Sequence, residues 1–492
     1  MLPLRLLAGD GLMALGALVG LGVLVGLGEG LRVWGVPVRT TRRLVHAGVS
    51  LFVASTPLLF TRPLPVYALA GLFVIFNAGA RLNHWWPGIH AARPKSWGTV
   101  ALPLSVVPAL AATWSVTPER ILALEAAYLV LGLADPAASW VGEGTTPEAR
   151  NRPSTLRGSL TFGGLALVLT TLLLATATPW SPLRVLGTAL GTTVVTTLVE
   201  SISSRGWDNL FVVVAVILVL VPLQTGGLTG AEFGAALLVG AVFAGGAYGA
   251  GALDGRGAAT GGLFAASLVG LGGEAWIGPG LVFFGLSSAL TGLRRDGREE
   301  SVRRTQAQVL ANGGVAWTAL AVVALTPAGT PDLRLWGYAA FIGALAAAAA
   351  DTWATELGSW SPVPPWSLRE QRRVPTGTSG AVSLVGTGAA FLGALSVVGT
   401  ALLVGGSLSG HPTQEVLLLC GAGVLGMGAD GVVGAFLQAQ YRTPASGRQV
   451  ERPPSTEAEL VRGSAAIGNN VVNLVGTTVG ALAALASVFL LG

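Results

Sequence analysis

Acidic residues that could bind metal or phosphate occur in both halves of a very apolar chain, close to the ends of its apolar runs. Ionisable residues at such places are costly in a membrane and are functional candidates by default. Carboxylates hold Mg²⁺, while arginines and the metal neutralise phosphate oxygens, so this combination is typical of phosphoryl transfer. The selected residues are His46, Asp135, Glu200 and Asp208 in the first half and Asp254, Asp351, Glu356 and Asp430 in the second.

The spacing of the second-half carboxylates indicates which of them can act together. Asp351 and Glu356 are five residues apart, which places them about 140° apart on a helix, so they need not share one ligand. Asp351 forms a more coherent face with the threonines one and four positions after it. We expect Asp254, Asp430 and Asn312 to meet that face across a helix bundle and to hold Mg²⁺.

A loop rich in Gly, Thr and Ser lies directly before an apolar run in the second half. Exposed N–H groups and hydroxyl groups at a helix N-terminus form an anion site. An ordinary turn is the alternative, and the neighbouring arginines favour phosphate. The predicted phosphate-binding residues here are Arg372, Arg373, Gly377, Thr378 and Ser379. A further polar set at another helix start consists of Asn469, Asn470 and Asn473.

The composition determines the class of element that must position these residues. Of 492 residues, 52% are hydrophobic and only 11% are charged, less than half of the roughly 25% usual in soluble domains. Runs of about 20 apolar residues, enough to span a bilayer, recur about fifteen or sixteen times. The sequence therefore predicts an all-α polytopic integral membrane protein with two bundles of about seven to eight transmembrane helices each.

Arginine and lysine are distributed unevenly between the loops that join the apolar runs. Because these residues concentrate in cytoplasmic loops, we place the richer set in the cytoplasm and the N-terminus outside, in a bacterial-type inner membrane. The richer set holds 23 of the 29. It comprises residues 37–43, 81–97, 142–157, 201–208, 252–256, 294–306, 359–378 and 439–466. The net charge of +5 suits anionic headgroups and nucleotides, so we expect membrane lipids as partners and no nucleic acid.

A break rich in Gly and Thr divides the chain into two comparable halves with different polar signatures. We predict one domain over residues 1–223, a linker over 224–230 and a second domain over 231–492. No clear repeat relates the halves, so each is treated as a separate unit. The oligomeric state does not follow from the sequence.

The first half resembles the family of phytol kinases and dolichol kinases, which transfer phosphate from CTP to a polyisoprenoid alcohol. The motifs occur in the order of that family and cover residues 40–222. They are RRLVHAG (42–48), RPKSWGTVALP (93–103), LADPAASWVGE (133–143), STLRGSLTF (154–162) and ESISSRGWDNL (200–210).

This resemblance implies roles for residues of the first half. Asp135 would bind metal and nucleotide phosphate, and a helix cap is the alternative because Asp-Pro favours a helix start. His46 would be a general base for the alcohol, with a plain helix-end histidine as the alternative. Glu200, Asp208 and Asn209 would support Asp135.

Phosphate contacts in the first half are implied by two further motifs. The sequence departs from the family where many members have Lys-Thr before a Gly-Ser pair, because Ser154-Thr155 stands there, and a flanking arginine would replace the lysine. The implied phosphate-binding residues are Lys95, Ser96, Thr99, Arg152, Thr155, Arg157 and Ser159.

The second half resembles the phytyl-phosphate kinase family, a membrane domain long without an assigned function. The match covers residues 230–490 in six ordered motifs. They are GALDGRGAATGGL (251–263), AQVLANGGVAW (307–317), ADTWATELG (350–358), RRVPTGTSGAVSLVGT (372–387), GADGVVGAFLQAQYR (428–442) and GNNVVNLVGT (468–477).

Together the resemblances imply a fused pair of membrane kinases that convert an isoprenoid alcohol to its monophosphate and then to the diphosphate. The implied phosphate donor is CTP or another nucleoside triphosphate, with Mg²⁺, and both sites face the cytoplasm. No GxxxxGK[ST] loop occurs. The rival functions are a cytidylyltransferase that forms a CDP-lipid and a non-enzymatic transporter, whose substrate would bind at the bilayer midplane.

Overall fold

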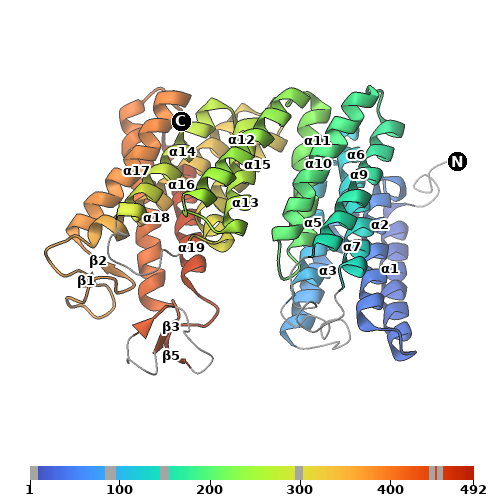
Figure 1. The fold of residues 1–492 in the computed structure, drawn as a ribbon, viewed down its shortest axis with the longest axis horizontal. Coiled ribbons are helices and arrows are strands. Elements are labelled where there is room, and N and C mark those ends of the chain that lie inside the picture. Colours follow the sequence, from blue (N-terminus) through green and yellow to red (C-terminus); the bar gives the residue numbers. More distant parts are fainter. Residues whose placement is uncertain are drawn as a thin grey trace. The chain divides into compact units, whose positions relative to one another are not determined.

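The computed structural model describes residues 9–83, 96–143, 155–293, 303–327, 329–442, 449–451 and 458–491. The chain forms two compact units, residues 1–234 and 235–492, which are called the first and second unit (Figure 1). The predicted linker 224–230 lies at the turn between the helices α11 (Asp208–Thr225) and α12 (Gly230–Gly249).

The first unit is built from long helices joined by short connections. Its helices are α1 (Asp10–Val33), α2 (Val38–Leu59), α3 (Leu64–Leu82), α5 (Gly98–Ala112), α9 (Leu156–Ala177), α10 (Pro182–Ile202) and α11. One further segment runs continuously through η2 (Pro118–Arg120), α6 (Ile121–Leu129), η3 (Val130–Ala134) and α7 (Asp135–Val141). α1 packs against α2, α3 against α5, and α11 against α5, α6 and α10.

The second unit has the same type of construction. It contains α12, α13 (Gly255–Ser267) with its continuation η4 (Leu268–Gly272), α14 (Glu274–Leu293), α15 (Gln306–Leu325), α16 (Pro331–Gly358), α17 (Leu384–Gly405), α18 (Pro412–Phe436) and α19 (Asn469–Leu491). α16 lies at the centre, because its alanine-rich stretch 337–350 is buried, except for the partly buried Ala340, and packs against α17, α18 and α19.

Close backbone approach explains why this core is rich in glycine and alanine. A Cβ atom at Gly343 of α16 would lie 2.4 Å from the carbonyl oxygen of Gly480 and from the methyl group of Ala484, both on α19. Small residues at such crossings let helices pack by van der Waals contact in lipid, where no hydrophobic effect drives association.

Thirteen helices of the described ranges are long and apolar enough to cross a membrane. The sequence prediction of fifteen or sixteen runs also counted shorter or more polar segments. α5 has 15 residues and α13 has 13, whereas α2 has 22 but contains three arginines among its first six residues. The prediction of an all-α polytopic membrane protein is confirmed.

Two small antiparallel sheets are the departure from an all-helical chain, and both lie in predicted polar loops. β1 (Trp366–Ser367) pairs with β2 (Ala381–Val382), with Trp366 opposite Val382. β3 (Gln440–Arg442) lies between β4 (Gln449–Val450) and β5 (Glu459–Arg462). The sheets pair backbone groups in loops that are too polar to enter the bilayer.

Candidate functional site

His46 of α2 lies against the irregular turn that precedes Asp135. Its Nε2 is 3.1 Å from the carbonyl oxygen of Leu131 and 3.5 Å from a carboxylate oxygen of Asp135. The turn η3 is π-helical, so the Leu131 carbonyl would accept the N–H of residue 136. That residue is Pro136, which has no N–H. The His46 ring therefore supplies the donor, and Nδ1 is left as the nitrogen that can accept a proton.

Three carboxylates from different helices gather beside this histidine. Asp135, Glu200 at the end of α10 and Asp208 at the start of α11 interact electrostatically. Ser159 of α9 donates a hydrogen bond to Glu200. The second oxygen of Glu200, Oε2, is buried and has no hydrogen-bond partner among the described residues. Like charges close together and a buried oxygen without a donor form a site that a cation would stabilise.

The N-terminus of α5 carries the predicted phosphate-binding hydroxyl groups. The N–H of Gly98 donates to Ser96 Oγ at 3.2 Å, and Arg42 of α2 lies 3.5 Å from the same oxygen. Asn209 of α11 donates to the Gly98 carbonyl at 2.9 Å. Thr99 Oγ1 is buried without a hydrogen-bond partner in the described chain. A helix start with an arginine and hydroxyl groups suits an anion.

The other predicted phosphate contacts of the first unit differ in their positions. Lys95 and Arg152 lie outside the described residues. Thr155 is the N-cap of α9, because its side chain accepts the N–H of the residue three positions on. Arg157 is exposed on the first turn of α9, and Ser159 contacts Glu200.

Arginines of α2 are functional candidates that the sequence reasoning left out. Arg42 follows the spacing i, i+4 with His46, which places both on one helix face, so the spacing would have identified it. Arg39 and Arg43 instead hold Glu143, just after α7, with Arg43 at 3.0 Å. The hydrogen bonds from Arg39 and Arg43 hold the pKa of Glu143 below its ordinary value.

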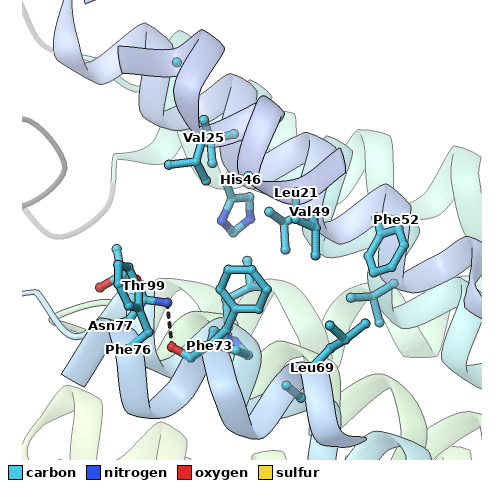
Figure 2. A pocket seen from close by; sticks show the side chains of 18 of the residues that line it. Leu21, Val25, His46, Val49, Phe52, Leu69, Phe73, Phe76, Asn77 and Thr99 are labelled. Carbon is cyan, nitrogen blue, oxygen red and sulfur yellow. Dashed lines mark hydrogen bonds between the residues drawn. The ribbon is translucent and has the colours of Figure 1, made fainter. Parts of the chain in front are cut away.

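A cavity of about 410 Å³ extends from the polar groups around His46 and Thr99 into the apolar interior of the first unit. Figure 2 shows His46, Val49 and Phe73 facing the cavity, with Asn77 and Thr99 toward one end and Phe52 and Leu69 toward the other. The polar residues of its wall are Glu29, Thr41, Arg42, His46, Asn77, Thr99 and Asn209; nearly all others are apolar. Such a cavity suits a molecule with an apolar chain and a small polar head.

The second unit brings together carboxylates that are far apart in the sequence. Asp351 of α16, Asp430 of α18 and Glu451 after β4 interact electrostatically. Asp430 Oδ2 is buried and has no hydrogen-bond partner in the described ranges. Asp430 packs on Gly476 of α19. One turn earlier on α19, Asn473 donates to Asn312 of α15 at 2.9 Å.

Two of the predicted metal ligands make contacts of their own, apart from the cluster of Asp351 and Asp430. Asp254 is the N-cap of α13 and accepts the N–H of Gly257 at 2.6 Å. Glu356 accepts a hydrogen bond from Thr291 of α14 at 3.0 Å, and Thr291 accepts another from Arg304. The five-residue spacing turns Glu356 away from Asp351, so the second-unit cluster consists of Asp351, Asp430 and Glu451.

The Gly/Thr/Ser loop is packed on the end of α18. Ser379 donates to Gln438 at 2.6 Å. Gly380 has a φ of +72°, and a Cβ there would lie 2.6 Å or less from backbone atoms of Ala435, so only glycine fits. Thr378 donates to the carbonyl of Pro375 and follows Gly377, whose φ is +89°. The loop is therefore a structured turn against the helix that carries Asp430.

The predicted arginines of this loop are engaged within it. Arg372 pairs with Glu370 at 2.5 Å, and Arg373 donates to the Pro364 carbonyl at 3.2 Å. Arg462 of β5, which the sequence reasoning left out, donates to the Gly434 carbonyl of α18 at 2.9 Å, and its Nε is buried without a partner in the described part. β5 places this arginine beside α18, and no sequence spacing indicates that contact.

The predicted asparagines at the start of α19 have different surroundings. Asn473 pairs with Asn312, whereas Asn469 and Asn470 occupy the first positions of the helix. Asn470 Oδ1 is buried without a hydrogen-bond partner among the described residues.

No group of three or more His, Cys, Asp or Glu side chains in the described ranges is arranged to hold a metal ion by itself. Mg²⁺ is usually bound by one or two carboxylates together with substrate phosphates and water. The unpartnered oxygens of Glu200 and Asp430 fit that mode, one in each unit.

Comparison with known proteins identifies a family that the second unit matches. Residues 238–481 match the integral membrane protein family DUF92. Protein PGR from Arabidopsis thaliana is 31% identical over 219 residues, which cover 40% of this chain and 75% of that protein. An uncharacterized membrane protein from Methanocaldococcus jannaschii is 33% identical over 105 residues, which cover 21% of this chain and 41% of that protein. No solved structure matches.

The family match lies within the second unit, where the carboxylate cluster of Asp351 and Asp430 is found. The resemblance of the first unit to phytol and dolichol kinases stays a prediction. From the match over 238–481 and the similarity to most of PGR, the chain belongs to the DUF92 family of integral membrane proteins.

Proposed function

We propose that the chain is a two-step membrane phosphotransferase, in which the first unit converts an isoprenoid alcohol to its monophosphate and the second unit converts the monophosphate to the diphosphate. The observation that carries this proposal is the apolar cavity whose wall bears His46, with Arg42, Thr99 and Asn209 at its polar end. A prenol has this same division between a long apolar chain and one hydroxyl group.

The first step follows from the orientation of His46. Its Nδ1 accepts the proton of the alcohol, and the alcohol oxygen attacks the γ-phosphorus of a nucleoside triphosphate, for which the resemblance favours CTP. The bond to the bridging oxygen breaks, and the nucleoside diphosphate leaves with the electron pair. Arg42 and the N-terminus of α5 neutralise phosphate oxygens. Glu200, with its unpartnered oxygen, and one of its neighbours Asp135 and Asp208 would hold Mg²⁺ together with nucleotide phosphates, and the metal would stabilise charge on the transferred group.

The second step needs no general base of the same type, because a phosphate monoester is already an anionic nucleophile. Its requirement is to bring two anions together. Asp351 and Asp430 would hold Mg²⁺, which would offset the negative charge of the phosphates, and Arg462 supplies a fixed positive charge at the adjacent end of α18.

From the charge distribution of the loops, we propose that each site faces the cytoplasm. The alternate connections that together hold 23 of the 29 Lys and Arg residues are the ones that the candidate residues lie near. The positive-inside rule places these connections in the cytoplasm, where nucleotide is available. We propose a bacterial-type inner membrane as the location and membrane lipids as the surrounding partners.

Purified protein incubated with Mg²⁺, labelled CTP and either phytol, geranylgeraniol, farnesol or a longer polyprenol tests both steps. The CTP carries its label on the γ-phosphate. We expect a labelled monophosphate first and a diphosphate later, separated by thin-layer chromatography, with CDP released. Release of pyrophosphate with a CDP-lipid would reject the kinase in favour of a cytidylyltransferase. Movement of prenol or phosphate across vesicles without any product would favour a transporter.

A further inference from the structure

The cavity of the first unit lies between two pairs of packed helices and is partly open. Its wall comes chiefly from α1 and α2 on one side and from α3 and α5 on the other. Three side chains of the wall are also substantially exposed at the outer surface, namely Leu18 at 37%, Leu72 at 49% and Phe76 at 41%. Leu18 belongs to α1 and the other two to α3, so the opening runs along these two helices.

α1 packs chiefly against α2 and less extensively against α3. Only Leu21 and Gly28 of α1 are buried. A Cβ at Gly28 would lie 2.7 Å from Val45, and one at Gly48 would lie 2.7 Å from Leu24, so α1 and α2 approach closely. Asp10 ties the other end of α1 to Thr61, just before α3.

We propose that the ligand of this cavity, a single-chain isoprenoid alcohol, enters sideways from the bilayer between α1 and α3 and that its monophosphate leaves by the same route. The route is called the lateral opening and is defined by Leu18, Leu72 and Phe76. The identity of the ligand rests on the proposed function of the first unit.

Energetics favour a lateral route over one through water. The chain is dissolved in lipid before binding and is enclosed by apolar side chains afterwards. Passage through water would expose it at a cost of about 0.8 kcal/mol for each CH₂ group. The head group advances along α2 to His46, and the chain never leaves an apolar environment.

The dimensions of the cavity imply tolerance of chain length. Glu29 and Leu18 of the wall are eleven residues apart on α1, as are Asn77 and Val66 on α3, which corresponds to roughly 16 Å. An extended chain advances about 1.25 Å per bond, so about 13 bonds fit inside. Longer chains extend through the lateral opening into lipid and are not excluded.

The test uses a photoreactive C20 isoprenoid alcohol in phospholipid vesicles that contain the full-length protein. Leu18→Cys and Leu72→Cys are introduced together in a Cys420→Ala background and joined by a cleavable bifunctional thiol reagent. We expect adducts on α1, α2, α3 and α5 before linking, loss of these adducts after linking, and their return on cleavage. Undiminished adducts in the linked protein would overturn the proposal.

A bulk substitution on the same helix provides an independent measurement. Leu72→Trp narrows the lateral opening and should slow the labelling, whereas Ile75→Trp, at a position that is 74% exposed and outside the cavity wall, should leave it unchanged. Equal labelling rates in both variants contradict the route. Labelling through the opening without any phosphate transfer would support the route and reject the proposed function. Phosphate transfer with labelling unaffected by the link would support the proposed function and reject the route.

Discussion

The orientation of the His46 ring depends on Pro136, a residue of another helix. Pro136 cannot donate an N–H to the π-helical turn, so the Leu131 carbonyl accepts from the His46 Nε2 at 3.1 Å. A carbonyl cannot donate, which fixes the neutral tautomer of the ring. In that tautomer Nδ1 carries no proton, and it is the nitrogen that we propose accepts the proton of the alcohol in the first step.

His46→Gln separates the binding role of this residue from its proton transfer. The glutamine amide can still donate to the Leu131 carbonyl, but it cannot accept the proton of an alcohol. We expect the rate of prenol phosphorylation to fall by about 10²- to 10⁴-fold, while conversion of supplied monophosphate continues at the normal rate. The measurement is product formation from each substrate separately. A first-step rate like that of the unaltered protein would show that His46 is not the base.

Asp430→Asn tests the second unit, and Glu415 of the same helix provides the control. Asp430 has a buried oxygen without a partner, so removal of its charge should not lower the thermal unfolding temperature. We expect monophosphate to accumulate because the second step is lost. Glu415 is fully buried and accepts hydrogen bonds from the side chains and N–H groups of the 407–409 turn.

The control variant should lose stability and keep the second step. Glu415→Gln weakens hydrogen bonds to a charged acceptor and should cost about 1–3 kcal/mol of stability, with the second step retained in the folded fraction. A fall in stability for Asp430→Asn, together with normal diphosphate formation, would assign a purely structural role to Asp430.

In the first unit, the sequence indicated which residues come together better than it indicated the contacts that each of them makes. His46, Asp135, Glu200 and Asp208 lie at helix ends on one side of the bundle, and that placement follows from the order of the apolar runs. The spacing of Asp351 and Glu356 likewise indicated that they diverge. Glu451 and Arg462 could not be predicted, because short strands bring them to α18 and a two- to four-residue strand leaves no periodic pattern.

At the scale of elements, α16 depends on glycine where α19 crosses it. Gly343→Ala would place a methyl group against the backbone of Gly480. We expect a loss of about 1–3 kcal/mol from overpacking, measured as a lower unfolding temperature in detergent.

Gly399→Ala in α17 is the matched control, because no atom lies within 4 Å of a Cβ at that position. There the higher helix propensity of alanine should leave stability unchanged or raise it by up to about 1 kcal/mol. If both variants unfold at the temperature of the unaltered chain, the α16–α19 contact is looser than described.

Element boundaries were predicted well where apolar runs end at polar loops and poorly where charge lies inside a helix. The segment 37–43 was expected to be a loop because of its three arginines, whereas α2 begins at Val38 and includes them. Proline at the preceding position starts the helix, and the arginines remain at its first two turns. The small sheets were unpredictable for a related reason, since their strands pair only two to four residues each.

At the scale of the whole chain, the loop charges predict which connections face the nucleotide pool. Single cysteines are introduced in a Cys420→Ala background at four exposed positions outside the candidate sites. Ser204→Cys and Arg369→Cys lie in connections that the charge pattern assigns to the cytoplasm and should resist an impermeant thiol reagent in intact cells. Glu119→Cys and Thr330→Cys lie in the opposite connections and should react. The reverse pattern would place both candidate sites outside and would reject the kinase proposal.

The charged start of α2 also has a consequence for biosynthesis. The first nine of its 22 residues include Arg39, Arg42, Arg43 and His46. The apolar remainder is shorter than the roughly 20 residues that span a bilayer. Arginines near a helix end cost less than arginines at its centre, but the short apolar stretch still makes α2 a weak membrane span on its own. We expect α1, which approaches α2 closely at Gly28 and Gly48, to stabilise α2 in the membrane as a helical hairpin. The same arginines that suit a phosphate therefore make the insertion of α2 cooperative, and a bulky residue at Gly28 should appear as a topology defect before it appears as a catalytic one.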